Sequence, residues 1–173
     1  MSTGSHDGGE LFCPAECLEG DTAVIFNYAR DLPGRIESLR PETEYGTGDV
    51  TFHTTPRHRH GMETYGLTFE LEGTALSFLP DTDCFPALGD IYADADILVL
   101  NVVRHHPVKS GNVQHLCVDD ARRVIDAAEP DMAILTHFGM TMVQAGPRSV
   151  ARDMSDELGI PVEAASDGRT FNL

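Results

Sequence analysis

The chain has 173 residues, which is enough for one domain with a sizeable hydrophobic core and too few for two large ones. Hydrophobic residues make up 41% of the sequence, an ordinary share for a globular protein, and this excludes a disordered chain. The formal net charge is −16, so no basic stripe is available to bind nucleic acid non-specifically.

The charged residues are also unusual in kind, because Lys109 is the only lysine among the 12 basic residues. An acidic, lysine-poor surface is typical of proteins from extreme halophiles, where the Debye length at about 1 M salt is only about 3 Å and self-repulsion is screened. We therefore predict a halophilic protein. An acidic protein from a non-halophilic organism is the alternative, and a wholly acidic proteome would weaken the inference against nucleic-acid binding.

The sequence gives no sign of export or of a membrane span. No run approaches 18 apolar residues, and the first ten residues contain no apolar signal core. The four cysteines do not suggest a disulfide framework. Cys13 and Cys17 have the spacing of half a zinc site, but without a second close pair we favour buried free thiols. These features predict a cytoplasmic protein.

In chain order, the pattern is rich in strands first and alternates between helices and strands later. Strands are predicted at 10–16, 49–55, 65–71, 74–79 and 97–103, whereas 20–32 fits either a strand or a helix. The third and fourth of these strands are separated by Glu72 and Gly73, which is typical of a β-hairpin.

The second half of the chain predicts a helix at 118–128, where apolar residues follow helical spacing, Asp119 and Asp120 occupy the first turn, and Pro130 follows the end. A strand at 132–136, a helix at 148–158 and final strands at 160–164 and 169–173 complete the pattern. We expect an α/β (α+β) fold in which a mixed sheet is flanked by helices.

Several histidines and one aspartate stand where predicted strands end. His58 and His60 follow the strand at 49–55, and an H-x-H pair on an extended segment can chelate zinc. The pair by itself favours two exposed loop histidines instead. Asp81, with Asp83 as its competitor, follows the strand at 74–79. His137 follows the strand at 132–136.

His115 lies 22 residues before His137, with the predicted helix and strand between them. A helix-and-strand crossover of this length returns the chain to the same edge of a sheet, so both imidazoles can face one cleft.

These residues bear a family resemblance. The segments TPRH at 55–58, LPDT at 79–82 and AILTHFGM at 133–140 resemble, in order, the third, fourth and fifth motifs of metallo-β-lactamase-fold metal-dependent hydrolases. The resemblance implies that His58 and His137 are metal ligands and that Asp81 bridges two metals. Residues 115–137 are also similar to the tRNA 3′-processing branch, which implies that His115 is a general acid and catalytic with Asp81.

The resemblance covers about residue 50 to the end and leaves out the defining motif of the superfamily. His-x-His-x-Asp-His should lie upstream and is absent from this sequence, and His6 with Asp7 cannot replace four ligands. We therefore expect residues 1–173 to form a single incomplete domain, the carboxyl-terminal half of a metallo-β-lactamase αββα sandwich, from a truncated or internally started chain.

The function implied by the resemblance is hydrolysis of an ester, lactone or phosphodiester with one or two Zn²⁺ ions, the second site being incomplete. Two alternatives stay open: a catalytically inactive fragment, and a metal-binding subunit completed by another chain. A third is a small αβ binding module with a histidine-rich surface. The expected partners are a small-molecule or phosphodiester substrate and a second copy or complementing chain.

Overall fold

The computed structural model describes residues 8–21, 23–107 and 114–171. The strands are β1 (Glu10–Pro14), β2 (Arg35–Leu39), β3 (Glu44–Thr47), β4 (Val50–Thr54), β5 (Leu67–Leu71), β6 (Thr74–Leu79), β7 (Ile97–Asn101), β8 (Met132–Thr136) and β9 (Val162–Ala164). The α-helices are α1 (Val118–Ala128), α2 (Met140–Ala145) and α3 (Pro147–Leu158), and the 3₁₀ turns are η1 (Ala15–Cys17), η2 (Asn27–Ala29) and η3 (Asp90–Tyr92).

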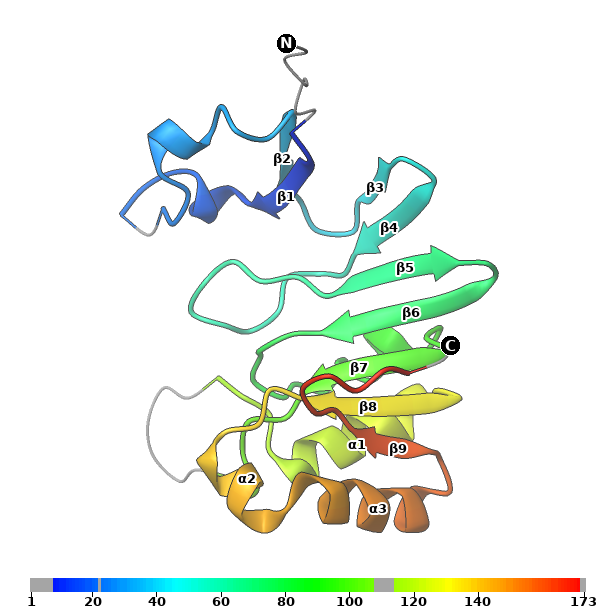
Figure 1. Ribbon diagram of the computed structural model, residues 1–173. Coiled ribbons are helices and arrows are strands. Elements are labelled where there is room, and N and C mark those ends of the chain that lie inside the picture. Colours follow the sequence, from blue (N-terminus) through cyan, green and yellow to red (C-terminus); the bar gives the residue numbers. More distant parts are fainter. Residues whose placement is uncertain (1–7, 22, 108–113, 172–173) are drawn as a thin grey trace.

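One mixed sheet of seven strands forms the body of the molecule, in the order β3-β4-β5-β6-β7-β8-β9 (Figure 1). The strands from β3 to β6 pair antiparallel, and those from β6 to β9 pair parallel. The predicted β5–β6 hairpin is present, and Glu72 and Gly73 turn the chain with φ of 52° and 88°. A separate parallel pair, β1 and β2, lies beyond the β3 edge, at the opposite end of the molecule from the helices.

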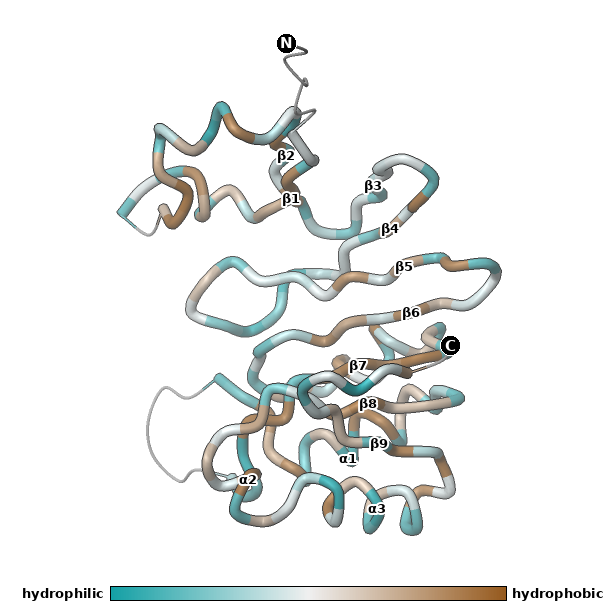
Figure 2. The backbone as a smooth tube through the Cα atoms, in the orientation of Figure 1, coloured by the Kyte–Doolittle hydropathy of each residue, from teal (hydrophilic) through white to brown (hydrophobic). Residues whose placement is uncertain are grey.

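One face of the parallel half of the sheet is covered by α1 and α3. Leu98, Leu100 and Leu135 from the strands join the apolar residues of the two helices in the main hydrophobic core. Figure 2 shows the hydrophobic colour concentrated along β7 and β8, in agreement with the burial of these strands. The expected helical spacing at 118–128 is confirmed, because the buried residues of α1 are those that the pattern selects: Val118, Ala121, Val124, Ile125 and Ala128.

The opposite face of the sheet is also apolar but less well covered. The strand register places Phe69, Leu76 and Ile97 on this face, with Phe78 beside them. Phe78 is 38% exposed on this face. Phe52, in β4, is buried against the ring of Phe12 from β1. The sheet therefore has one closed face and one that is partly open.

Two expectations for the secondary structure were wrong. The described residues of 20–32 form only the 3₁₀ turn η2 among bends and turns. Three elements, β2, β3 and α2, were not foreseen. The predicted strand at 169–173 is absent from its described part, 169–171, and its last two residues lie outside the described residues, as do His6 and Asp7. Within the described ranges, no helix is long and hydrophobic enough to cross a membrane.

Candidate metal centre

Four strands of the sheet deliver their following loops to one edge. Strand β4 pairs antiparallel with β5 and β5 with β6, so β4 runs in the same direction as β6, β7 and β8. The carboxyl ends of these four strands consequently meet at one edge. His60 follows β4, Asp81 follows β6 and His137 follows β8. Clefts at the carboxyl ends of parallel strands are the usual ligand sites in α/β sheets.

Asp81 is the centre of this cluster. Its Oδ1 accepts a hydrogen bond from Asn101 Nδ2 at 3.1 Å, which fixes the carboxylate against the end of β7. The two carboxylate oxygens face two different imidazoles. His115 Nδ1 lies 3.4 Å from Oδ1, and His137 Nε2 lies 3.3 Å from Oδ2. The structure thus brings together three of the four site residues that the sequence predicts: Asp81, His115 and His137.

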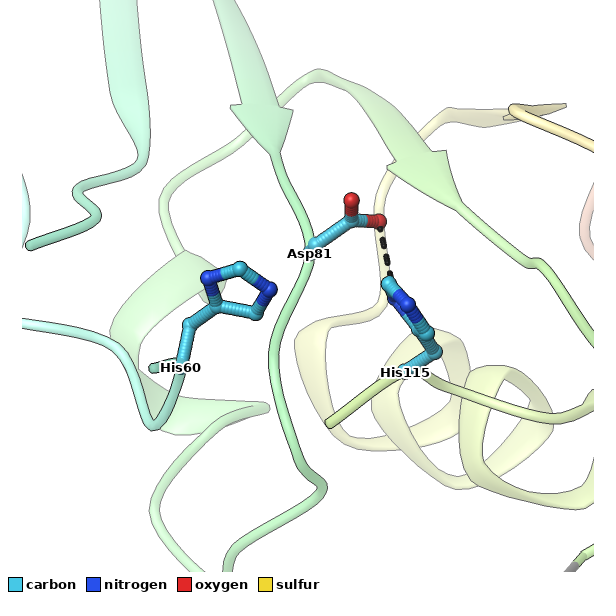
Figure 3. Close-up of side chains that lie close together, drawn as sticks. All are labelled: His60, Asp81 and His115. Carbon is cyan, nitrogen blue, oxygen red and sulfur yellow. Dashed lines mark ion pairs between the residues drawn. The ribbon is translucent and has the colours of Figure 1, made fainter. Parts of the chain in front are cut away.

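His60 is the site residue that the sequence analysis did not select. Figure 3 shows His60 and His115 on either side of Asp81, and one ligand atom from each of the three residues lies within 4.8 Å of the other two. The loop of His60 is held to the loop of Asp81, because Arg59 N donates to Thr82 Oγ1 at 3.1 Å and Asp83 N donates to Arg59 O at 2.8 Å. The H-x-H pair in the sequence was the signal for His60.

His58, predicted as a ligand, is not brought to this cluster. Its side chain is buried, only 2% exposed, and both ring nitrogens have other neighbours. Nδ1 lies 3.1 Å from Pro56 O, and Nε2 lies 2.8 Å from the Tyr92 hydroxyl. Burial lowers the pKa of His58, which the Pro56 carbonyl only partly opposes. A neutral imidazole that donates from Nδ1 and accepts at Nε2 satisfies both contacts, so His58 is well placed as a core residue.

His137 occupies an unusual backbone conformation. It directly follows β8 with a φ of 58°, in the left-handed region. The chain then turns, and Gly139 N donates to Val103 O at 3.0 Å, close to the end of β7. Histidine is among the residues that tolerate this region, and strained conformations of this kind cluster at functional sites. The turn directs the imidazole back over Asp81.

The composition of the cluster suits a transition metal. Imidazole nitrogens with a carboxylate are the donors of many zinc and non-haem iron sites. His115 Nδ1 is buried and has no hydrogen-bond partner among the described residues, although Asp81 Oδ1 lies 3.4 Å away. A carboxylate with an imidazole beside each of its two oxygens is a set of donor atoms that suits a bound cation. The residues present therefore fit a metal.

Comparison with known proteins agrees with this fold. A family model described as a beta-lactamase superfamily domain matches residues 2–138. An uncharacterized protein, MJ1374 of Methanocaldococcus jannaschii, is 27% identical over 155 residues, which cover 87% of this chain and 56% of the relative. The chain thus spans about half the length of that relative.

Two solved structures show the same fold at low sequence identity. A diphosphatase of the PhnP family is 18% identical with a TM-score of 0.66, and the match covers 95% of this chain and 59% of that one. Igni18, a metallo hydrolase from Ignicoccus hospitalis, is 15% identical with a TM-score of 0.63, and the match covers 95% of this chain and 69% of that one.

Proposed function

The chain belongs to the beta-lactamase superfamily, and from this premise we propose that it is a metal-dependent hydrolase whose metal centre is built around Asp81. The observation that carries the proposal is the convergence of His60, His115 and His137 on one carboxylate. The two similar solved structures are a diphosphatase and a metallo hydrolase, which supports hydrolysis as the reaction class.

We assign metal binding to His60, Asp81 and His137, because a ligand atom of His60 lies within 4.8 Å of one of Asp81, and His137 Nε2 lies 3.3 Å from Asp81 Oδ2. A catalytic zinc site usually has three protein ligands and one open position, and these residues supply that number. A metal held here would polarise the scissile bond and lower the pKa of water towards about 7. Zinc is our choice, although two histidines and one carboxylate are also the ligand set of non-haem iron sites.

The protein's own groups have separate tasks in this proposal. The Asn101 amide holds the Asp81 carboxylate in one orientation. A carboxylate fixed in this way can orient the attacking water by a hydrogen bond. His115 lies on the other side of Asp81, with its Nδ1 3.4 Å from Asp81 Oδ1. We assign it the role of proton donor to the leaving group, because its ring faces the same centre. His137 has a side chain that is 55% exposed, so the centre is open to a substrate from solvent.

A second candidate function is a metal-binding subunit whose site is completed by another chain. It is favoured by the sequence, which holds no His-x-His-x-Asp-His motif to provide ligands for a second ion. In this form residues 1–173 remain the single incomplete domain that we proposed from the sequence, and the chain alone is inactive.

Metal stoichiometry and site variants test the proposal. After equilibration with Zn²⁺ and removal of free metal, elemental analysis is expected to find about one ion per chain, the number that three ligands can hold. His60→Ala and His137→Ala should lower the affinity more than about tenfold, because loss of even a supporting group costs that much. His115→Asn should keep the metal and lose turnover; loss of metal would make His115 a ligand.

Two histidines outside the cluster serve as controls. His58→Ala should melt at a lower temperature and keep its metal, since the side chain is buried against Tyr92. His105→Ala should leave the affinity unchanged, because within the described residues the ring of His105 pairs with its exposed neighbour His106 and not with the cluster. Equal losses of affinity in all the histidine variants would indicate non-specific chelation and contradict the proposed centre.

A further inference from the structure

A small cavity adjoins the candidate metal centre on the side of His115. It has a volume of about 140 Å³ and is lined by His115, Arg104, Cys117 and Asp120, among others. This volume is several times the roughly 30 Å³ that one water occupies in the liquid, so there is room for a tetrahedral oxyanion. His115 lines the cavity and also contacts Asp81, so a group in the cavity would lie next to the proposed reacting centre.

Arg104 is the cation of this cavity, and its charge is not paired. Its Nε is buried and has no hydrogen-bond partner, and no carboxylate of the described residues lies within ion-pair distance of it. The backbone of Arg104 is fixed beside the segment that carries His115. Its N–H donates to Leu116 O at 3.3 Å, and its carbonyl accepts from Val118 N at 3.0 Å. A guanidinium with a buried, unused N–H is a binding group for an oxyanion.

The carboxylates near the cavity do not cancel this charge. Asp120 is already engaged, since its Oδ2 accepts from the Cys117 N–H and thiol at 3.0 Å each and its Oδ1 from Arg123. Burial alone would raise the pKa of Asp120, but these hydrogen bonds outweigh it and lower the pKa. Asp83 also lines the cavity, and among the described residues its carboxylate forms no ion pair with Arg104.

We propose that Arg104 binds the phosphate group of the substrate, and that the chain hydrolyses phosphodiesters in preference to neutral esters. The inference rests on the hydrolase function proposed above. Three bond types fit metal-assisted hydrolysis at such a centre, namely esters, lactones and phosphodiesters. Only the phosphodiester bears a negative charge near neutral pH at the reacting group. An unpaired arginine with a buried Nε beside the centre therefore favours the phosphodiester, because a neutral ester leaves the guanidinium without a partner.

The test compares two chromogenic substrates, bis(4-nitrophenyl) phosphate and 4-nitrophenyl acetate, with zinc-loaded protein. Arg104→Met is expected to lower kcat/KM for the diester by about 10- to 100-fold, the usual effect of losing a charge-assisted hydrogen bond, and to leave the acetate rate unchanged. Arg104→Lys, which keeps the charge, should recover part of the loss. Arg148→Met, an exposed arginine of α3 away from the centre, is the matched control and should behave as the wild type.

A binding measurement separates this inference from the proposed function. Calorimetric titration of metal-free protein with inorganic phosphate is expected to show binding that Arg104→Met weakens about tenfold or more and Arg148→Met does not. Phosphate binding that is the same in both variants overturns the inference, as does an equal loss of diester and acetate hydrolysis in Arg104→Met. Absence of any turnover by the wild type, with phosphate binding intact, would contradict the hydrolase and not the phosphate site.

Each variant is first checked for a cooperative thermal transition. If Arg104→Met does not fold, Arg104→Gln, which retains a polar head without the charge, replaces it against Arg104→Lys. Tighter phosphate binding by Arg104→Lys than by Arg104→Gln supports the inference. Equal affinity of these two variants contradicts it.

Discussion

At the scale of single residues, burial separates two histidines that are neighbours in one loop. His58 packs against the rings of Phe85 and Tyr92, with centroids 6.3 and 5.9 Å away, and it is shielded from Asp81. His60 lies at the edge of the sheet, with its ring centroid 6.0 Å from that of His115. Histidine is a core residue at position 58 and a candidate ligand at position 60, because the neighbours of the two imidazoles differ.

The left-handed backbone at His137 allows the cost of its conformation to be measured separately from its role in metal binding. With φ at 58°, any residue other than glycine is held in a conformation that costs about 1–2 kcal/mol. His137→Gly and His137→Ala both remove the imidazole, so both should lose metal affinity to the same degree. Chemical denaturation should find the glycine variant more stable than the alanine variant by about 1 kcal/mol. Equal stabilities would show that the left-handed conformation is not retained in the variants.

At the scale of elements, the candidate centre depends on how the β4–β5 connection closes. Thr55 N donates to Gly66 O at 3.0 Å, and Gly66 N donates to Thr55 Oγ1 at 2.8 Å, so the two ends of this loop are joined. The loop is then bound to the one after β6 through Arg59 and Thr82. These contacts hold His60 beside Asp81, although 20 residues lie between them in the sequence.

The glycine at this closure is required by its neighbour. A Cβ at Gly66 would lie 1.9 Å from the Tyr92 hydroxyl and 2.9 Å from Thr55 Cγ2, and Tyr92 is only 1% exposed and hydrogen-bonded to His58. Gly66→Ala should therefore destabilise the fold by about 1–3 kcal/mol, the usual cost of overpacking, as measured by urea unfolding.

Gly46→Ala in β3 is the control for this substitution, since its Cβ would meet only Val50 O, at 3.9 Å. A Gly66→Ala variant as stable as Gly46→Ala would mean that Tyr92 can move aside at little cost, and that the packing of His58 is looser than we describe.

At the scale of the whole molecule, large apolar side chains remain exposed in three places among the described residues, one of which is α2 with Met140 and Val143. The sheet face opposite α1 and α3 exposes Phe78, and the segment between β1 and β2 exposes four large side chains: Val24, Phe26, Tyr28 and Leu32. Phe26 and Tyr28 stack on each other with centroids 5.7 Å apart, at exposed fractions of 64% and 79%. Contiguous apolar surface on a soluble protein normally finds a partner.

We predict that the chain associates with itself when it is expressed alone. Sedimentation in about 2–3 M KCl, where charge repulsion is fully screened, should find species larger than a monomer, and Phe78→Gln or Tyr28→Ser should reduce their share. If the acidic surface is a halophilic adaptation, the thermal transition should also sharpen and rise with KCl in this range. A monomer with a sharp cooperative transition would contradict the half-domain proposal.

The sequence by itself determined those features that depend on local pattern. Alternation and apolar runs predicted β5, β6, β7 and β8, the helical spacing predicted α1, and the polar residues after strand ends pointed to Asp81 and His137. These succeeded because side chains alternate in a strand and repeat every 3.6 residues in a helix, so burial on one face is written in neighbouring positions. The family followed from three short motifs in order.

Only the tertiary structure decided what depends on distant neighbours. Strand β2 has a mostly polar sequence and exists through its parallel pairing with β1, and no local period reports such pairing. The choice of His60 over His58 was set by Tyr92, which lies 34 residues from His58. Arg104 carries no local sign of an unused N–H either. In each case the deciding quantity is desolvation, which depends on what the fold packs around a side chain and not on its place in the sequence.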